Sequence, residues 1–156
     1  MKFIFLYVGG LQVTANHLAD AALAAVSLPG WAVCAGPGTG PIAIVDDDEW
    51  VLKSLARLVK SAGFQVETFV SAENFLEVGR DSKTRCVILD IGLPGMSGLD
   101  LQRHLAAKNF RVPIIFISAH DETENRTQAL AGGAIAFLSK PVDDKELLAA
   151  LDAAAK

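Results

Sequence analysis

Polar residues able to bind a metal ion or a phosphoryl group follow four separate apolar runs of this chain. They are Asp46 and Asp47 after Ile42–Val45, Asp90 after Val87–Leu89, Ser118 after Pro113–Ile117, and Lys140 shortly after Ile135–Leu138. Short apolar runs with β-branched members are typical of strands buried on both faces of a parallel sheet. In such sheets the functional crevice lies beyond the carboxyl ends of the strands. We therefore expect these five side chains to meet at one edge of a sheet.

Three carboxylates at one sheet edge would repel one another. At separations of about 5 Å and an effective dielectric near 20, the repulsion is roughly 3 kcal/mol per pair. Mg²⁺ would offset it, because this ion is bound by carboxylates together with carbonyl, water and phosphate oxygens. Lys140 adds a second positive charge, and Ser118 adds an uncharged hydrogen-bond donor. A carboxylate nucleophile, a metal, a lysine and a hydroxyl together predict a phosphoryl-transfer site.

The elements that must position these residues alternate regularly from Ile42 onward. The sequence predicts strands at Ile42–Val45, Gln65–Val70, the run ending at Asp90, Pro113–Ile117 and Ile135–Leu138. The expected helices follow Asp48, Ser71, Ser97 or Gly98, Asp121 and Asp143. Strict alternation of strands and helices implies right-handed crossovers and a parallel sheet covered on both faces. We predict an α/β fold with a five-stranded parallel sheet, a flavodoxin-like (βα)5 doubly wound three-layer sandwich.

Three residues near the predicted site have simpler interpretations than chemistry. Asp48 is interpreted as the N-cap of the first helix of this region rather than as a metal ligand. Trp50 is interpreted as a packing residue, and His120 as a solvated loop residue rather than a phosphodonor.

Composition and cysteine usage restrict the function classes. Of the 156 residues, 51% are apolar and 21% are charged, and the net charge of −4 argues against a general nucleic-acid binder. Cys34 and Cys86 lie far apart, which makes a disulfide framework unexpected and leaves no zinc-binding spacing. A reducing, cytoplasmic setting fits these features best.

Residues 1–40 differ in composition from the rest. An apolar run over residues 1–8 precedes an Ala-rich stretch and a Gly/Pro linker. The run is too short to span a bilayer, but it has the length of the apolar core of a signal peptide. An export signal and a membrane-associated tail stay open as alternatives. We expect a poorly ordered N-terminal extension over residues 1–40 and one domain over residues 41–156.

Residues 42–152 resemble the receiver domain of two-component response regulators. The matching segments are Val45–Asp48, Leu89–Gly98, Ile117–Ala119 and Leu138–Pro141. The resemblance implies that Asp90 accepts the phosphoryl group, that Asp47 binds Mg²⁺ directly and that Asp46 acts on the metal mostly through water. It also implies that the Gly92 carbonyl is a metal ligand.

The same resemblance assigns the remaining site residues. Ser118 and Lys140 would be the switch hydroxyl and the phosphate-facing lysine, and Lys140–Pro141 is expected to be a cis peptide. Phe137 takes the position of a switching aromatic residue, which would turn inward on phosphorylation.

The resemblance also implies the partners. They are a sensor histidine kinase or a histidine phosphotransfer protein and a downstream protein target, with a phosphorylation-dependent homodimer as one option and no direct nucleic-acid binding. Nothing follows Lys156 that would serve as an output domain, so we expect either a receiver acting through protein contacts or a fragment. The protein would be a signalling receiver and not an enzyme.

Two other functions were weighed. A small Mg²⁺-dependent phosphatase with Asp90 as nucleophile would typically need a second acid two residues later, where this chain has Gly92. A flavodoxin-like module that binds FMN is disfavoured because three carboxylates would repel the phosphate.

Overall fold

The computed structural model describes residues 4–8, 11–15, 40–79, 83–120 and 122–154, in two units, Met1–Thr39 and Gly40–Lys156. In the first unit, β1 (Ile4–Val8) pairs antiparallel with β2 (Leu11–Ala15). The poorly ordered extension expected over residues 1–40 stays a prediction, although these ten residues pair as a hairpin. Two apolar runs separated by Gly-Gly are a hairpin signal that the prediction did not use. The predicted linker lies outside the described residues except for its last residues, Gly40 and Pro41.

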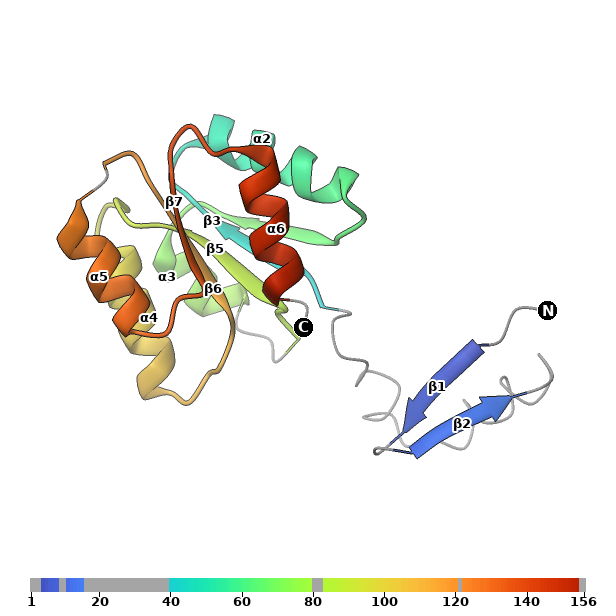
Figure 1. Cartoon of the computed structure of the whole chain (residues 1–156). Helices are drawn as coiled ribbons and strands as arrows, with labels where there is room; N and C mark the ends of the chain where they lie inside the picture. Colours follow the sequence, from blue (N-terminus) through green and yellow to red (C-terminus); the bar gives the residue numbers. More distant parts are fainter. Residues whose placement is uncertain (1–3, 9–10, 16–39, 80–82, 121, 155–156) are drawn as a thin grey trace. The chain divides into compact units, whose positions relative to one another are not determined.

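The second unit is built on a five-stranded parallel sheet (Figure 1). Its strands, in sequence order, are β3 (Ile42–Val45), β4 (Val66–Phe69), β5 (Cys86–Asp90), β6 (Ile114–Ser118) and β7 (Ala136–Ser139). Their spatial order is β4-β3-β5-β6-β7, and every neighbouring pair is parallel. This is the flavodoxin-like doubly wound α/β fold, as predicted, and it brings the carboxyl ends of all five strands to one edge.

Helices cover both faces of this sheet (Figure 1). One face packs against α2 (Glu49–Ser61) and α6 (Asp144–Ala154). The other packs against α3 (Ala72–Asn74) with the π-helical turn η1 (Phe75–Gly79), α4 (Gly98–Ala107) and α5 (Thr123–Ala131). Side chains alternate along each strand, so each strand contributes to both apolar layers. The three-layer sandwich is therefore confirmed, while the π-helical turn was not predicted.

Side-chain caps begin α2 and α4, the two helices next to the site. Asp48 accepts hydrogen bonds from the amides of Trp50 and Val51, at 2.8 and 3.4 Å, which confirms its interpretation as an N-cap. Ser97 and Asp100 form a reciprocal capping box at the start of α4. These caps fix where each helix starts, and hence the length of the loops around the strand ends.

The indole of Trp50 does not pack into the core. The residue is 78% exposed, and the Lys53 ammonium lies 5.6 Å from the centre of its ring. The packing role expected for it is wrong, because Trp50 lies on the solvent side of α2 and the apolar stripe of that helix is formed by Leu52, Leu55 and Val59.

Within the described part of the chain, every helix is too short or too polar to traverse a bilayer.

Removal of the Phe75 ring should destabilise the second unit strongly. Phe75 is fully buried and meets Phe69 edge-to-face, with ring centres 5.3 Å apart. Phe75→Ala should lower the free energy of unfolding by about 3–5 kcal/mol, measured by urea denaturation. The control is Val78→Ala, in the same turn at 71% exposure, which should change it by less than about 0.5 kcal/mol. Equal effects of the two substitutions would contradict the assigned burial.

Candidate functional site

Three carboxylates meet at the carboxyl edge of the sheet. Oxygen atoms of Asp46, Asp47 and Asp90 all lie within 4.8 Å of one another. Asp46 directly follows β3 and Asp90 ends β5, and these strands are neighbours. The expected clustering of strand-end carboxylates is therefore present. Asp90 is only 5% exposed and Asp46 is fully buried, so Asp47 is the cluster's exposed member.

Lys140 bridges the two buried carboxylates. Its Nζ lies 2.9 Å from Asp46 Oδ2 and 3.3 Å from Asp90 Oδ1. The other oxygen of Asp46 accepts the Asp48 amide at 2.8 Å, so this carboxylate is held at both ends. Lys140 follows β7, and the Lys140–Pro141 peptide is cis, as expected. The Lys140 ammonium thus connects the end of the edge strand β7 to the carboxylates beside the central strands β3 and β5.

The electrostatics of the site follow from this arrangement. Burial raises the pKa of the Asp90 carboxyl, and the charges of Asp46 and Asp47 raise it further against the opposing effect of Lys140. Burial alone would lower the pKa of the Lys140 ammonium, but its hydrogen bond to Asp46 and the nearby negative charges raise it overall. Asp90 is therefore a basic carboxylate beside a firmly protonated lysine. That is a suitable pairing for a nucleophile that must attack an anionic group.

Ser118 ends β6 at the same edge, and its hydroxyl is engaged within its own loop. Ser118 Oγ donates to the His120 carbonyl at 2.6 Å and accepts the His120 amide at 3.2 Å. The His120 side chain is exposed, in agreement with its interpretation as a solvated loop residue. For Ser118 to donate to a group on Asp90, its bond to the His120 carbonyl has to break.

Phe137 is already buried in this structure. It is 5% exposed, with its ring centre 6.5 Å from that of Phe116 and the Arg126 guanidinium 5.5 Å from its ring. The ring thus packs between β7 and the α4–α5 layer in this structure, and the inward turn expected on phosphorylation stays a prediction.

Two glycines at the connection between β5 and α4 have distinct roles. Gly98 starts α4 against the strand end, where a Cβ would lie 2.5 Å from the Asp90 carbonyl oxygen. Gly92, the predicted carbonyl ligand, lies two residues after Asp90. Farther along the loop, the Met96 amide donates to Glu73 Oε1 at 2.9 Å. The sequence did not predict a role for Glu73, because its hydrogen bond joins residues 23 positions apart and no local sequence pattern indicates it.

The carboxylate cluster fits a hard divalent cation. Its three negative charges are opposed by one ammonium, and oxygen atoms within 4.8 Å of one another can share one ion. Mg²⁺ prefers such oxygen ligands and keeps several waters of its own. The residues that could hold it are Asp46, Asp47 and Asp90.

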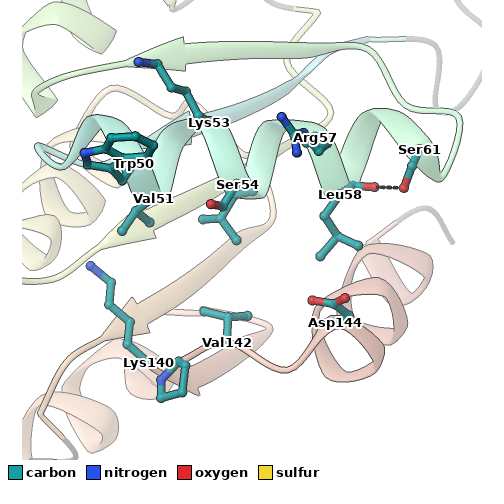
Figure 2. Close-up of a pocket in the computed structure, with 12 residues that line it drawn as sticks. Trp50, Val51, Lys53, Ser54, Arg57, Leu58, Ser61, Lys140, Val142 and Asp144 are labelled. Atoms are coloured by element: carbon teal, nitrogen blue, oxygen red, sulfur yellow. Dashed lines mark hydrogen bonds between the residues drawn. The ribbon is translucent and has the colours of Figure 1, made fainter.

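A pocket of about 840 Å³ adjoins the site on the side of α2 (Figure 2). Lys140 and Val142 form one wall, and the α2 residues Val51 and Leu58 face them across it. Its lining is mainly apolar, with Lys53 and Arg57 adding positive charge. It therefore offers an open surface next to Lys140, separate from the carboxylate cluster.

Known proteins with this arrangement are response regulators. The family model for the response regulator receiver domain matches residues 42–152. The response regulator protein TodT of Pseudomonas putida is 46% identical over 115 residues, which are 74% of this chain and 51% of TodT. Nodulation protein W of Bradyrhizobium diazoefficiens is 45% identical over 111 residues, which are 71% of this chain and 49% of that protein. The chain thus spans about half the length of these curated relatives.

A solved structure agrees with the sequence relatives. The crystal structure of FixJ-N superposes with a TM-score of 0.68 at 33% identity, and the match covers 74% of this chain and 93% of that one. The matched segment contains the sheet, its four helical connections and the carboxylate cluster together. By fold, by sequence and by the residues at its sheet edge, this chain belongs to the response regulator receiver domain family of two-component systems.

Proposed function

We propose that the protein receives a phosphoryl group on Asp90, in a Mg²⁺-dependent transfer from a phosphohistidine of a kinase or phosphotransfer protein. The observation that carries this proposal is the position of Asp90. It is buried at the end of β5, within 4.8 Å of two other carboxylates and 3.3 Å from the Lys140 ammonium.

In the proposed reaction, a carboxylate oxygen of Asp90 attacks the phosphorus while the bond from phosphorus to the donor's imidazole nitrogen breaks. The products are an aspartyl phosphate and a neutral histidine, which takes its proton from water. Lys140 neutralises charge on the phosphoryl oxygens, and Mg²⁺, when bound, supplies further positive charge to them. Asp46 and Asp47 would hold the ion with Asp90 and the Gly92 carbonyl, and Ser118 would donate to the phosphoryl group afterwards.

Two faces of the domain would serve two partners. The pocket beside Lys140, with the exposed Trp50 on its rim, is open to the phosphoryl donor (Figure 2). The face from Thr123 to Leu151 includes α5, β7 and α6, and there we place the downstream protein target or a second phosphorylated copy. Both partners belong in the cytoplasm, where the protein acts as a signalling switch and not as a turnover enzyme. The phosphatase alternative gains no support, because Gly92 stands where its second acid would be.

Mg²⁺ binding should require Asp47. Asp47→Ala should abolish it, because the substitution removes the exposed ligand without disturbing the core. The measurement is an NMR titration that follows the amides around Asp90. The control Asp48→Asn keeps the helix cap and lies outside the cluster, so it should bind the ion nearly as well as the wild type. An unchanged titration of Asp47→Ala would remove Asp47 from the site.

Phosphorylation should fall on Asp90. With acetyl phosphate and Mg²⁺, intact-mass measurement should show one added phosphoryl group, which hydroxylamine removes because it is an acyl phosphate. Asp90→Asn keeps the shape of the side chain but cannot form this adduct. The control Asp152→Asn, at an exposed position of α6, should be labelled like the wild type. The same adduct on Asp90→Asn would show that another residue is the acceptor.

Ser118 should transmit the modification to the Thr123–Leu151 face. Beryllofluoride with Mg²⁺ should shift backbone NMR resonances of this face, and Ser118→Ala should reduce the remote shifts while shifts around Asp90 persist. The control is Thr68→Ala, an exposed position of β4 at the sheet edge opposite β7, which should leave the remote shifts intact. If the Thr123–Leu151 face does not respond in the wild type, the domain binds the phosphoryl analogue without signalling through that face.

A further inference from the structure

One carboxylate outside the acidic cluster holds the loop that follows Asp90. Glu73 Oε1 accepts the Met96 backbone amide at 2.9 Å, and this bond joins α3 to the loop between β5 and α4. Glu73 is exposed and takes no part in the apolar layers. Its contact is therefore with the loop backbone rather than with the core.

The loop is shaped to receive this carboxylate. Gly95, next to Met96, has a φ of +77°, a conformation that disfavours residues with a side chain. A Cβ at Gly95 would also lie 2.8 Å from Glu73 Oε1. The backbone conformation thus favours glycine at residue 95, and a side chain there would displace the Glu73 carboxylate from its present position.

Glu73 is well suited to accept such a bond. Hydrogen bonds hold the pKa of the Glu73 carboxyl below its usual range. The Met96 amide has the largest effect, and the backbone amide of Glu73 itself and the Ser71 hydroxyl add to it. The side chain is thus ionised at neutral pH, and a charged acceptor makes a stronger hydrogen bond than a neutral one.

The loop is fixed at its other end by bonds of its own. The Gly98 amide donates to the Ile91 carbonyl at 3.2 Å, and Ser97 caps α4. Gly92 lies within the segment that these bonds close, and its carbonyl is a ligand in the proposed metal site. The Glu73–Met96 bond acts on the outer part of the same loop from a different element.

We propose that Glu73 is a positioning residue, which through the Met96 amide holds the loop after Asp90 in the conformation that the Gly92 carbonyl needs to bind Mg²⁺. This inference rests on the proposed function, because it assigns Glu73 a role in the same metal and phosphoryl site. Residues that orient metal ligands typically change metal affinity by 10–100-fold. Glu73 acts through a backbone segment, so we expect about tenfold, the lower end of that range.

The test compares Glu73→Ala, Glu73→Gln and Glu77→Ala with the wild-type chain. Glu77→Ala is the matched control, because Glu77 is an exposed carboxylate of the adjoining turn whose side chain makes no hydrogen bond to the described residues. For each protein, NMR titration gives the Mg²⁺ affinity and the amide shift of Met96, and intact mass gives the rate of phosphorylation by acetyl phosphate. Urea denaturation records stability separately.

Glu73→Ala should move the Met96 amide resonance, weaken Mg²⁺ binding about tenfold and slow phosphorylation, with stability near that of Glu77→Ala. Glu73→Gln retains an acceptor oxygen and should recover most of the affinity. Equal Mg²⁺ affinity in Glu73→Ala and the wild type would overturn the inference, as would a Glu73→Gln protein as weak as Glu73→Ala. A wild-type chain that takes neither Mg²⁺ nor a phosphoryl group would instead refute the proposed function.

Discussion

The closeness of three carboxylates at one sheet edge is the constraint on which the rest of the site depends. Burial first, and then the charges of Asp46 and Asp47, raise the pKa of Asp90 in the folded protein. Because the pKa of Asp90 is higher in the folded than in the unfolded protein, protonated Asp90 stabilises the folded state. This contribution to the free energy of unfolding is complete below the unfolded pKa and is lost as the pH rises through the folded pKa. At neutral pH the ionised Asp90 therefore lowers stability, and the Lys140 bridge offsets part of that cost. A cation that binds the cluster in the folded protein, and not the unfolded chain, would offset more of this loss of stability.

In the three central strands, β3, β5 and β6, the fold meets this constraint by placing charged groups only at or beyond the strand ends. Within the strands β3, β5 and β6 nearly every side chain is buried and apolar, and the layers on both faces leave no room for a charge. The helices then begin immediately beside the site. Asp48 caps α2 next to the cluster, and Gly98 lets α4 start against the Asp90 carbonyl. The same short connections that close the sandwich also keep the carboxylates from moving apart.

The sequence determined the strand-end residues well and the contacts between distant segments poorly. Asp46, Asp90 and Lys140 could be predicted to converge because each follows an apolar run, and parallel strands end at one edge. Glu73 could not, because its partner is a backbone amide 23 residues away and depends on how a Gly-rich loop bends. Nor could the burial of Phe137, since the space around its ring is set by α4 and α5 together. Local sequence patterns predict where a residue lies along a strand or helix. The conformation of a loop and the space left around a side chain depend instead on how the layers pack together.

The energetics of the proposed switch require a source of free energy beyond the hydrogen bond of Ser118. Exchanging the Ser118 bond to the His120 carbonyl for one to a charged phosphoryl oxygen gains only about 1 kcal/mol, the difference between neutral and charge-assisted hydrogen bonds. Moving a two-state equilibrium from 1:99 to 99:1 takes about 5.5 kcal/mol. Ser118 alone therefore does not supply the proposed switch. A second source is the ammonium of Lys140, which is shared between two carboxylates and which a more highly charged phosphoryl group would draw away from Asp46. A bound Mg²⁺ would add a third.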